Sequence, residues 1–208
     1  MLILVIVAAC AGGSAGPGPA APAPGPAAPS LGRVRPLLPK PVFVNAIDLA
    51  PAGRIELYAA HLDDGRRCWT FVTAGRAATG RPELVLSVLA APTPDAAPPL
   101  DPAVALLGSM MRSPTDAFVL GAWDSASVPV GLFGRADLDG IAAIPAAGPQ
   151  GVPLPSGALT VVLLTSQETE VAAALGATRV LGRLGQHERF YPAPWWNDLA
   201  RTSSVVDG

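Results

Sequence analysis

The chain has few charged residues and few of the side chains from which catalytic and metal sites are built. Only 14% of its 208 residues are charged, and it contains two histidines and two cysteines. Its 14 basic residues, of which Lys40 is the only lysine, nearly balance 16 acidic ones. Nucleic-acid-binding proteins normally carry a clear basic excess, so the sequence argues against a nucleic-acid partner. It also lacks a run of 18 or more apolar residues, which argues against a membrane-spanning helix.

Motifs for catalysis or metal binding are equally scarce. Within residues 42–201 the sequence has neither a Gly-x-Ser-x-Gly nucleophile elbow nor a phosphate-binding loop that ends in Lys-Ser/Thr. Cys68 could act as a nucleophile with His61 or His187 as its base, but its strand-like surroundings favour a buried structural cysteine. His61, His187 and Glu188 lack the close spacing of metal ligands. The sequence therefore predicts no catalytic residue, no metal site and no cofactor.

The first ten residues have the pattern of an exported lipoprotein. Residues 2–9 form the apolar run LILVIVAA, which has the length of a signal-peptide core and is too short to span a bilayer. Cys10 follows directly, and the sequence VAAC resembles the lipobox at which bacterial lipoproteins are lipidated and cleaved. No Lys or Arg precedes the run, so either the true start lies upstream of Met1 or the segment is not a signal peptide. The alternative interpretation is the hydrophobic N-terminus of a cytosolic protein.

This pattern predicts a lipid-anchored protein of the bacterial cell envelope, attached to the membrane through lipidated Cys10. Several acyl chains would hold it firmly, since each buried methylene contributes roughly 0.8 kcal/mol. Ala11 replaces the Asp that retains some lipoproteins at the inner membrane, which slightly favours the outer membrane. Residues 11–41 consist mostly of Gly, Ala, Pro and Ser, and they predict a disordered, semi-rigid tether of at most about 90 Å.

Residues 42–201 have the composition of a globular domain, and residues 202–208 form a polar tail. Apolar patterning predicts eight strands, at 42–47, 54–62, 68–73, 83–89, 116–123, 130–133, 140–144 and 158–165. Turn-forming residues between the first four favour antiparallel neighbours. Because the strands come in runs and do not alternate with helices, we predict a single α+β domain of mainly antiparallel sheet with two principal helices.

Capping signals and apolar periodicity predict those two helices. Asp101, followed by proline, is typical of a helix N-cap with proline at the first helical position. Thr165 and Glu168 have the spacing of a capping box, so we interpret Glu168 as a helix cap rather than as a catalytic acid. The helix that follows is expected to continue to about Leu184, although glycines weaken it. Gly185 is a natural stop signal at its end.

The adjacent residues Trp195 and Trp196 are the strongest candidates for a partner-binding surface. They follow two prolines, and tryptophan is enriched at the energetic centres of protein interfaces. Two adjacent side chains in such a segment cannot both point the same way, so one could pack on the core while the other meets a partner. The alternative is that both are packed inward and form a C-terminal clasp.

Four segments carry a resemblance to a known family. They are residues 68–75 (CWTFVTAG), 80–86 (GRPELVL), 179–185 (RVLGRLG) and 189–194 (RFYPAP). In order and spacing they resemble the C-terminal domain of Smad anchor for receptor activation and its FYVE-containing relative endofin, across residues 42–199. A weaker likeness is to suppressor-of-fused-like domains, some of which act as bacterial immunity proteins.

The resemblance implies an interaction module without assigned catalytic residues, so it transfers no functional residue to this chain. The FYVE finger is absent, and a lipoprotein-like leader stands in its place. We therefore predict a non-enzymatic, membrane-anchored domain that binds a protein partner of unknown identity. The alternatives are an immunity protein that neutralises a toxin and, less favoured, a hydrolase that uses Cys68.

Overall fold

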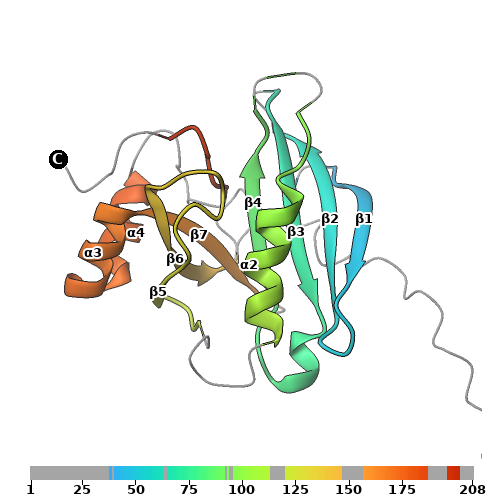
Figure 1. The fold of residues 1–208 in the computed structure, drawn as a ribbon, viewed down its shortest axis with the longest axis horizontal. Helices are drawn as coiled ribbons and strands as arrows, with labels where there is room; N and C mark the ends of the chain where they lie inside the picture. The colour runs from blue at the N-terminus through green and yellow to red at the C-terminus, as the bar shows by residue number, and fades with distance from the viewer. Residues whose placement is uncertain are drawn as a thin grey trace, which may run out of the picture.

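The computed structural model describes residues 38, 40–62, 65–91, 93, 96–112, 120–146, 157–186 and 196–201 (Figure 1). These residues form one mixed sheet of seven strands with three α-helices, so the predicted α+β class is confirmed. In chain order the elements are β1 (Val42–Asp48), β2 (Arg54–His61), β3 (Arg67–Ala74), the 3₁₀ turn η1 (Arg76–Thr79), β4 (Leu84–Leu89), α2 (Leu100–Arg112), β5 (Ser125–Ser127), β6 (Leu138–Pro145), β7 (Leu159–Thr165), α3 (Ser166–Leu175) and α4 (Ala177–Gln186).

The sheet consists of two antiparallel halves joined by one parallel contact. Its strand order is β1-β2-β3-β4-β7-β6-β5. Strands β1 to β4 form an antiparallel meander, as the turn-forming residues between them predicted. Strand β6 is likewise antiparallel to β5 and to β7, the strands on either side of it. The halves meet where β4 and β7 run parallel, and that pairing covers only Leu84 with Leu159 and Val85 with Thr160.

The predicted count of eight strands is wrong, and the error lies in the middle of the chain. Residues 130–133 form turns, which Gly131 and Gly134 permit by adopting φ angles of 79° and 71°. The segment predicted as a strand at 116–123 reaches the described residues only from Leu120, and it too ends in a turn there. A short strand at Ser125–Ser127 pairs with β6 instead.

The helices also differ in number from the prediction. The helix expected to continue to Leu184 is divided at Gly176, whose φ of 89° is outside the helical region, so α3 and α4 are separate. Gly185 lies within α4 rather than after it. The capping box is confirmed, because the Thr165 hydroxyl accepts the Glu168 amide and the Glu168 carboxylate accepts the Thr165 amide. None of the helices in the described ranges is long and apolar enough to cross a membrane.

Helices cover opposite faces of the two halves. Helix α2 packs on one face of β2, β3 and β4 through Leu106, Leu107 and Met110, in a core that continues across β6 and β7. Helices α3 and α4 pack on the other face of β6 and β7 through residues such as Val180 and Leu184. Figure 1 shows this arrangement, with α2 in front of the meander and α3 and α4 beside β6 and β7.

The face of the meander opposite α2 has no helix in the described residues. It carries Tyr58, Cys68 and Val85, all of them buried. The residues that cover it are Leu38, Ala146, Ala158 and Trp196. Leu38 is only 2% exposed, so the packed domain includes a side chain upstream of β1.

Candidate functional site

Strands β4 and β7 diverge after their two paired positions, and Asn197 fills the fork between them. On the β4 side, its amide donates to the Ser87 carbonyl at 2.7 Å and its carbonyl accepts the Leu89 amide at 2.9 Å. On the β7 side, its side-chain oxygen accepts the Leu163 amide at 2.7 Å and its Nδ2 donates to the Val161 carbonyl at 3.0 Å. One side chain thus takes the place of a peptide group and joins the two halves of the sheet.

Residues 196–201, here called the C-terminal strap, hold Asn197 in place. The indole of Trp196 packs against the meander and is 9% exposed. Arg201, 6% exposed, forms an ion pair with Glu168, donates to its Oε2 at 2.8 Å, and also donates to the Leu163 carbonyl. A buried carboxylate is costly unless it is paired, so the fully buried Glu168 requires a partner such as Arg201. Glu168 therefore caps α3 and anchors the strap at the same time.

The structure describes one of the two tryptophans of the sequence prediction, Trp196. Trp196 is buried, which both interpretations of the pair allow, and the guanidinium of Arg66 lies 5.6 Å from its ring centroid. Trp195 lies outside the described residues, so partner binding through it stays a prediction. Cys10 also lies outside them, as do His187 and Glu188.

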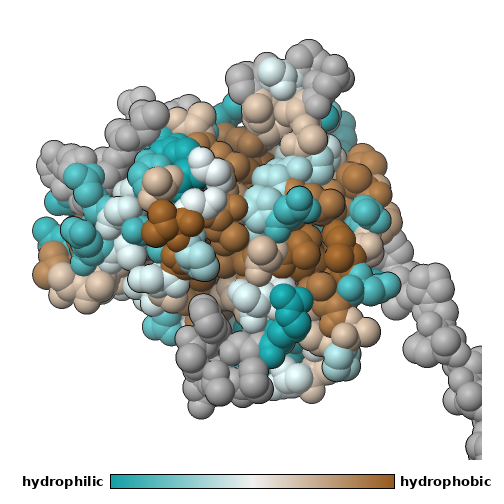
Figure 2. All heavy atoms as spheres, in the orientation of Figure 1, coloured by the Kyte–Doolittle hydropathy of each residue, from teal (hydrophilic) through white to brown (hydrophobic). Residues whose placement is uncertain are grey.

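A large open groove adjoins the strap at the end of β4, and we call it the C-terminal groove. Its volume is about 870 Å³. It is lined by His61, Gly65, Arg66, Arg67, Leu89, Ala90, Ala91, Thr93, Ala97, Pro99, Asp198, Leu199 and Ala200. Figure 2 shows hydrophobic surface in this region, between the strap and the upper end of α2. Its lining combines small apolar residues with four charged or titratable ones, which is the mixed composition of protein-binding surfaces.

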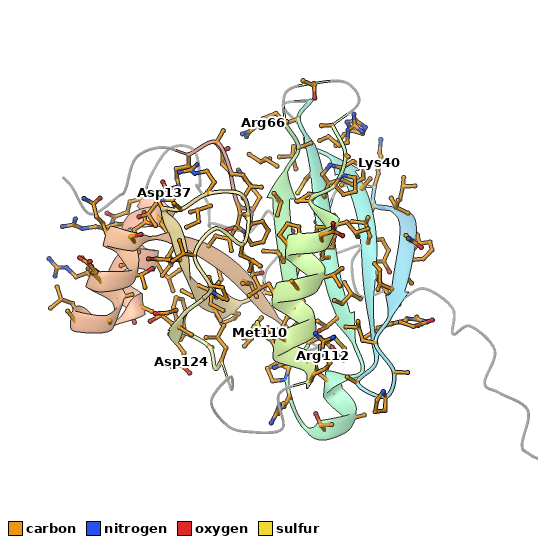
Figure 3. The ribbon with its side chains drawn as sticks, viewed as in Figure 1. Lys40, Arg66, Met110, Arg112, Asp124 and Asp137 are labelled. Carbon is orange, nitrogen blue, oxygen red and sulfur yellow. The ribbon has the colours of Figure 1, made fainter. Side chains whose placement is uncertain are left out.

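Two arginines mark one rim of the groove. Arg66 is exposed and is labelled at the upper end of the sheet in Figure 3. The guanidinium of Arg67 lies 5.4 Å from the ring centroid of Trp69. This contact and that of Arg66 with Trp196 have cation–π geometry, which favours a fixed position for each guanidinium group. Sequence reasoning did not find this groove, because its lining comes from three separate stretches of the chain.

Cys68 lies in surroundings that disfavour its action as a nucleophile. Its side chain is fully buried, and burial raises the pKa of the thiol to about 11. A thiol must lose its proton to attack, and at neutral pH this one keeps it. Cys68 pairs with Ala60 across β2 and β3, so His61, one position further on, projects from the opposite face of the sheet. His61 is therefore not a base for Cys68.

The remaining polar and metal-ligating side chains within the described ranges do not meet the requirements of a metal site. No group of three His, Cys, Asp or Glu side chains there is close enough to hold a metal ion. Cys68, Thr70 and Ser87 form a chain of buried polar groups, in which the Thr70 and Ser87 hydroxyls are 2.8 Å apart. These contacts satisfy polar groups inside the sheet, where all three residues are buried.

Two of the segments that carry the family resemblance, residues 68–75 and 80–86, serve the fold. Residues 68–75 are β3 and its following turn, and residues 80–86 lead into β4. Glu83 ties the two together: its carboxylate accepts the Thr73 hydroxyl at 2.7 Å and the amides of Gly75 and Ala77. Arg76 donates to the Met110 carbonyl at 2.7 Å and so fixes this turn to α2. Burial lowers the pKa of Arg76 from its usual value.

Comparison with known proteins gives a likeness in fold. No family model matches the chain, and no curated protein sequence matches it significantly. The fold is similar to that of a chain in the crystal structure of the Sufu–Fu complex, with a TM-score of 0.60 and 19% identity over 85% of this chain and 89% of that one. It is also similar to Drosophila Suppressor of Fused, with a TM-score of 0.58 and 20% identity over 85% of this chain and 50% of that one.

These identities support a shared fold and no shared residue roles. The likeness supports the weaker of the two resemblances seen in the sequence, that to suppressor-of-fused-like domains. The resemblance to Smad anchor for receptor activation and endofin stays a prediction. The chain therefore has a Suppressor-of-Fused-like α+β fold.

Proposed function

We propose that this chain is a non-catalytic protein-interaction domain that binds its partner in the C-terminal groove. The observation that carries the proposal is the groove itself, a volume of about 870 Å³ whose lining includes apolar residues and two arginines. The buried, protonated thiol of Cys68 further supports a role without nucleophilic chemistry. One structural neighbour comes from a complex between two proteins, Sufu and Fu, which is consistent with this class of function.

The groove has the anatomy that a protein segment requires. Leu89, Ala91 and Leu199 provide apolar surface, and burying it on binding would contribute roughly 25 cal/mol for each Å² removed from water. The charged groups Arg66, Arg67 and Asp198 lie around this surface, where they can select a partner by charge complementarity. Its small side chains leave room for larger side chains from a partner.

We propose further that the domain is anchored in the bacterial envelope by lipid on Cys10. The support is the residue pattern alone: the apolar run 2–9, the small residues before Cys10 and the Pro-rich stretch that follows. Metabolic labelling with an alkyne-bearing palmitate tests the proposal. Label should enter the wild-type chain and be lost in Cys10→Ala; equal labelling of both, or of neither, would contradict lipidation at this residue.

A crosslinking pull-down from bacterial envelope extract tests the interaction proposal. The bait begins at Leu31, so that Leu38 remains in the packed domain. Ala97→Glu places a larger, charged side chain in the groove at an exposed position, and it removes no core contact. Ala78→Glu makes the same change at an exposed position outside the groove and serves as the matched control.

The proposal expects one protein to be captured by the wild type and by Ala78→Glu, and lost with Ala97→Glu. Capture by all three baits would remove the groove as the binding surface. Trp196→Ala is not suitable as a probe, because Trp196 is buried and its loss would disturb the core. Trp195→Ala tests the remaining half of the sequence prediction in the same assay.

A further inference from the structure

We propose that a second pocket, next to Trp123, binds an organic cation through the Trp123 indole and the Asp124 carboxylate. We call it the Trp123 pocket, and its volume is about 430 Å³. Small-molecule sites commonly have volumes of roughly 300–1,000 Å³, so the pocket can hold a ligand of this kind. None of the described residues that line it also lines the C-terminal groove, so this site is independent of the proposed function.

The walls of the Trp123 pocket come from three parts of the fold. Met110 of α2 and Ile141 of β6 provide an apolar wall, and both are fully buried. Three alanines and a glycine from the junction of α3 and α4 line another side, where their small size leaves room for a ligand. The turn before β5 supplies Trp123 and Asp124. In Figure 3, Asp124 is labelled at the lower end of the view and Arg66 at the upper end, so this pocket and the groove lie apart.

The indole of Trp123 is exposed at a point where the backbone is bonded in place. The residue is 51% exposed, whereas tryptophan is on average highly buried. Its φ angle of 72° lies in the left-handed region, which is uncommon for residues other than glycine. Its amide donates to the Ala143 carbonyl at 2.7 Å, and the Ala143 amide donates to the Asp124 carbonyl at 3.0 Å. These bonds tie the turn to β6 and fix the point from which the indole projects.

The electrostatic character of the pocket is set by Asp124. Among the described residues that line the pocket, it is the one that carries a charge. Its Oδ2 accepts the Gly121 amide at 2.9 Å, which holds the carboxylate in this turn. The end of α3 and the start of α4 both border the pocket, and their partial charges have opposite signs and largely offset each other. The carboxylate therefore gives the pocket a net negative charge.

An indole and a carboxylate in one pocket together select for a positively charged ligand. Tryptophan attracts cations to its ring face more strongly than the other aromatic side chains do, and quaternary ammonium groups are recognised in this way. An anion would be repelled by Asp124, and a neutral ligand would gain nothing from its charge. An inorganic cation is disfavoured, because a single carboxylate offers it too few oxygen ligands. Charge complementarity thus specifies an organic cation, such as a quaternary ammonium or a guanidinium group.

Two pairs of probes test the role of the ligand's charge. Choline is compared with its neutral isostere, in which carbon replaces the quaternary nitrogen. The amide of N-acetyl-arginine is compared with that of N-acetyl-citrulline, in which a neutral urea replaces the guanidinium. Each probe is titrated into the full chain with isotope-labelled tryptophan, and two-dimensional NMR follows the indole signals. Trp123→Phe identifies the signal that belongs to Trp123.

Asp124→Asn isolates the charge of the pocket, because the new side chain keeps an oxygen that can accept from Gly121. Asp48→Asn makes the same substitution at an exposed position on β1 and serves as the matched control. We expect at least one cation to shift the Trp123 signal and to bind about fivefold or more tightly than its neutral isostere. We expect Asp124→Asn to weaken that cation by about two- to fivefold, as is typical of an exposed ion pair, and Asp48→Asn to leave its affinity unchanged.

The choice between choline and the arginine derivative shows which kind of cation the pocket prefers, and a preference for either supports the proposal. Three results would overturn it: no shift of the Trp123 signal with either cation, equal affinities of both cations and their neutral isosteres, or equal affinities in Asp124→Asn and Asp48→Asn. None of these outcomes bears on the pull-down with Ala97→Glu, because Ala97 lines the groove and not this pocket.

Discussion

At the scale of single residues, buried polar side chains carry much of the specificity of this fold. Asn197, Glu83 and Glu168 are each buried, and each accepts hydrogen bonds from main-chain groups that would otherwise be unsatisfied. Groups of this kind contribute modestly when paired and cost a great deal when one partner is lost. Substitutions at these three positions should therefore lower the unfolding free energy more than substitutions of exposed polar residues do.

Asn197→Asp isolates the amide's role as a donor. The carboxylate can still accept from Leu163 but cannot donate to Ser87 and Val161, so we expect unfolding free energy to fall by about 2 to 5 kcal/mol. Urea unfolding measures the change. Asn45→Asp, the same substitution on the exposed face of β1, should change stability by less than about 0.5 kcal/mol. Equal effects at the two positions would contradict the account of the fork.

Cys68 should resist alkylation in the native protein. Its thiol is buried and protonated at pH 8, because its pKa is about 11. Iodoacetamide treatment at that pH, followed by peptide mass spectrometry, should find Cys68 unmodified in the native state and modified in urea. Rapid modification of the native protein would mean that this thiol is accessible, and would reopen the hydrolase hypothesis.

The raised pKa of Cys68 also predicts a pH dependence. The folded state holds the thiol proton more tightly than the unfolded state, whose value is 9.0. The resulting contribution to stability is fully present below pH 9 and declines as pH rises from 9 towards 11. Urea unfolding across this interval should show a steeper loss for the wild type than for Cys68→Ala. Parallel curves would show that the thiol does not titrate differently in the two states.

At the scale of elements, close packing between α3 and β6 depends on a glycine. A Cβ at Gly140 would lie 2.0 Å from the Thr169 hydroxyl oxygen and 2.9 Å from its Cβ. We expect Gly140→Ala to destabilise the fold by about 1 to 3 kcal/mol. Gly185→Ala, on α4 with open space around it, should be neutral or slightly stabilising. Thermal unfolding of the two variants measures the stability of each relative to the wild type.

A second substitution checks that the cost at Gly140 comes from Thr169. Thr169→Ala removes the nearest clashing atom, so the double variant Gly140→Ala/Thr169→Ala should lose less stability than the sum of the single variants. If the stability losses of the two single variants simply add in the double variant, the cost at Gly140 does not come from Thr169.

Much of the first half of the fold could be predicted from the sequence, because local signals govern it. Alternating side chains and turn residues gave β1 to β4, and the spacing of Thr165 and Glu168 gave the cap of α3. Residues 130–133 were misread because four hydrophobic or glycine residues resemble a short strand, while positive φ at Gly131 makes them a turn. The division of α3 from α4 likewise depended on the conformation adopted by Gly176.

At the scale of the whole molecule, the strap and the groove could not be predicted from local pattern. Asn197 bonds with Ser87, 110 positions earlier, and with Val161, 36 positions earlier. Such contacts depend on where β4 and β7 cease to pair, and the alternation of apolar residues along the sequence does not indicate that position. Of the two tryptophans that the sequence singled out, Trp196 anchors the strap in the core, and partner binding through the pair stays a prediction.

The most direct test of the central claim is site-specific photo-crosslinking at the C-terminal groove. A photo-reactive amino acid is placed at Ala200, which is exposed and lines the groove, or at Val130, which is 67% exposed and lies outside it. In envelope extract we expect a discrete crosslinked protein from position 200 and none from position 130. No crosslink at position 200, or the same products from both positions, would contradict a partner bound in the groove.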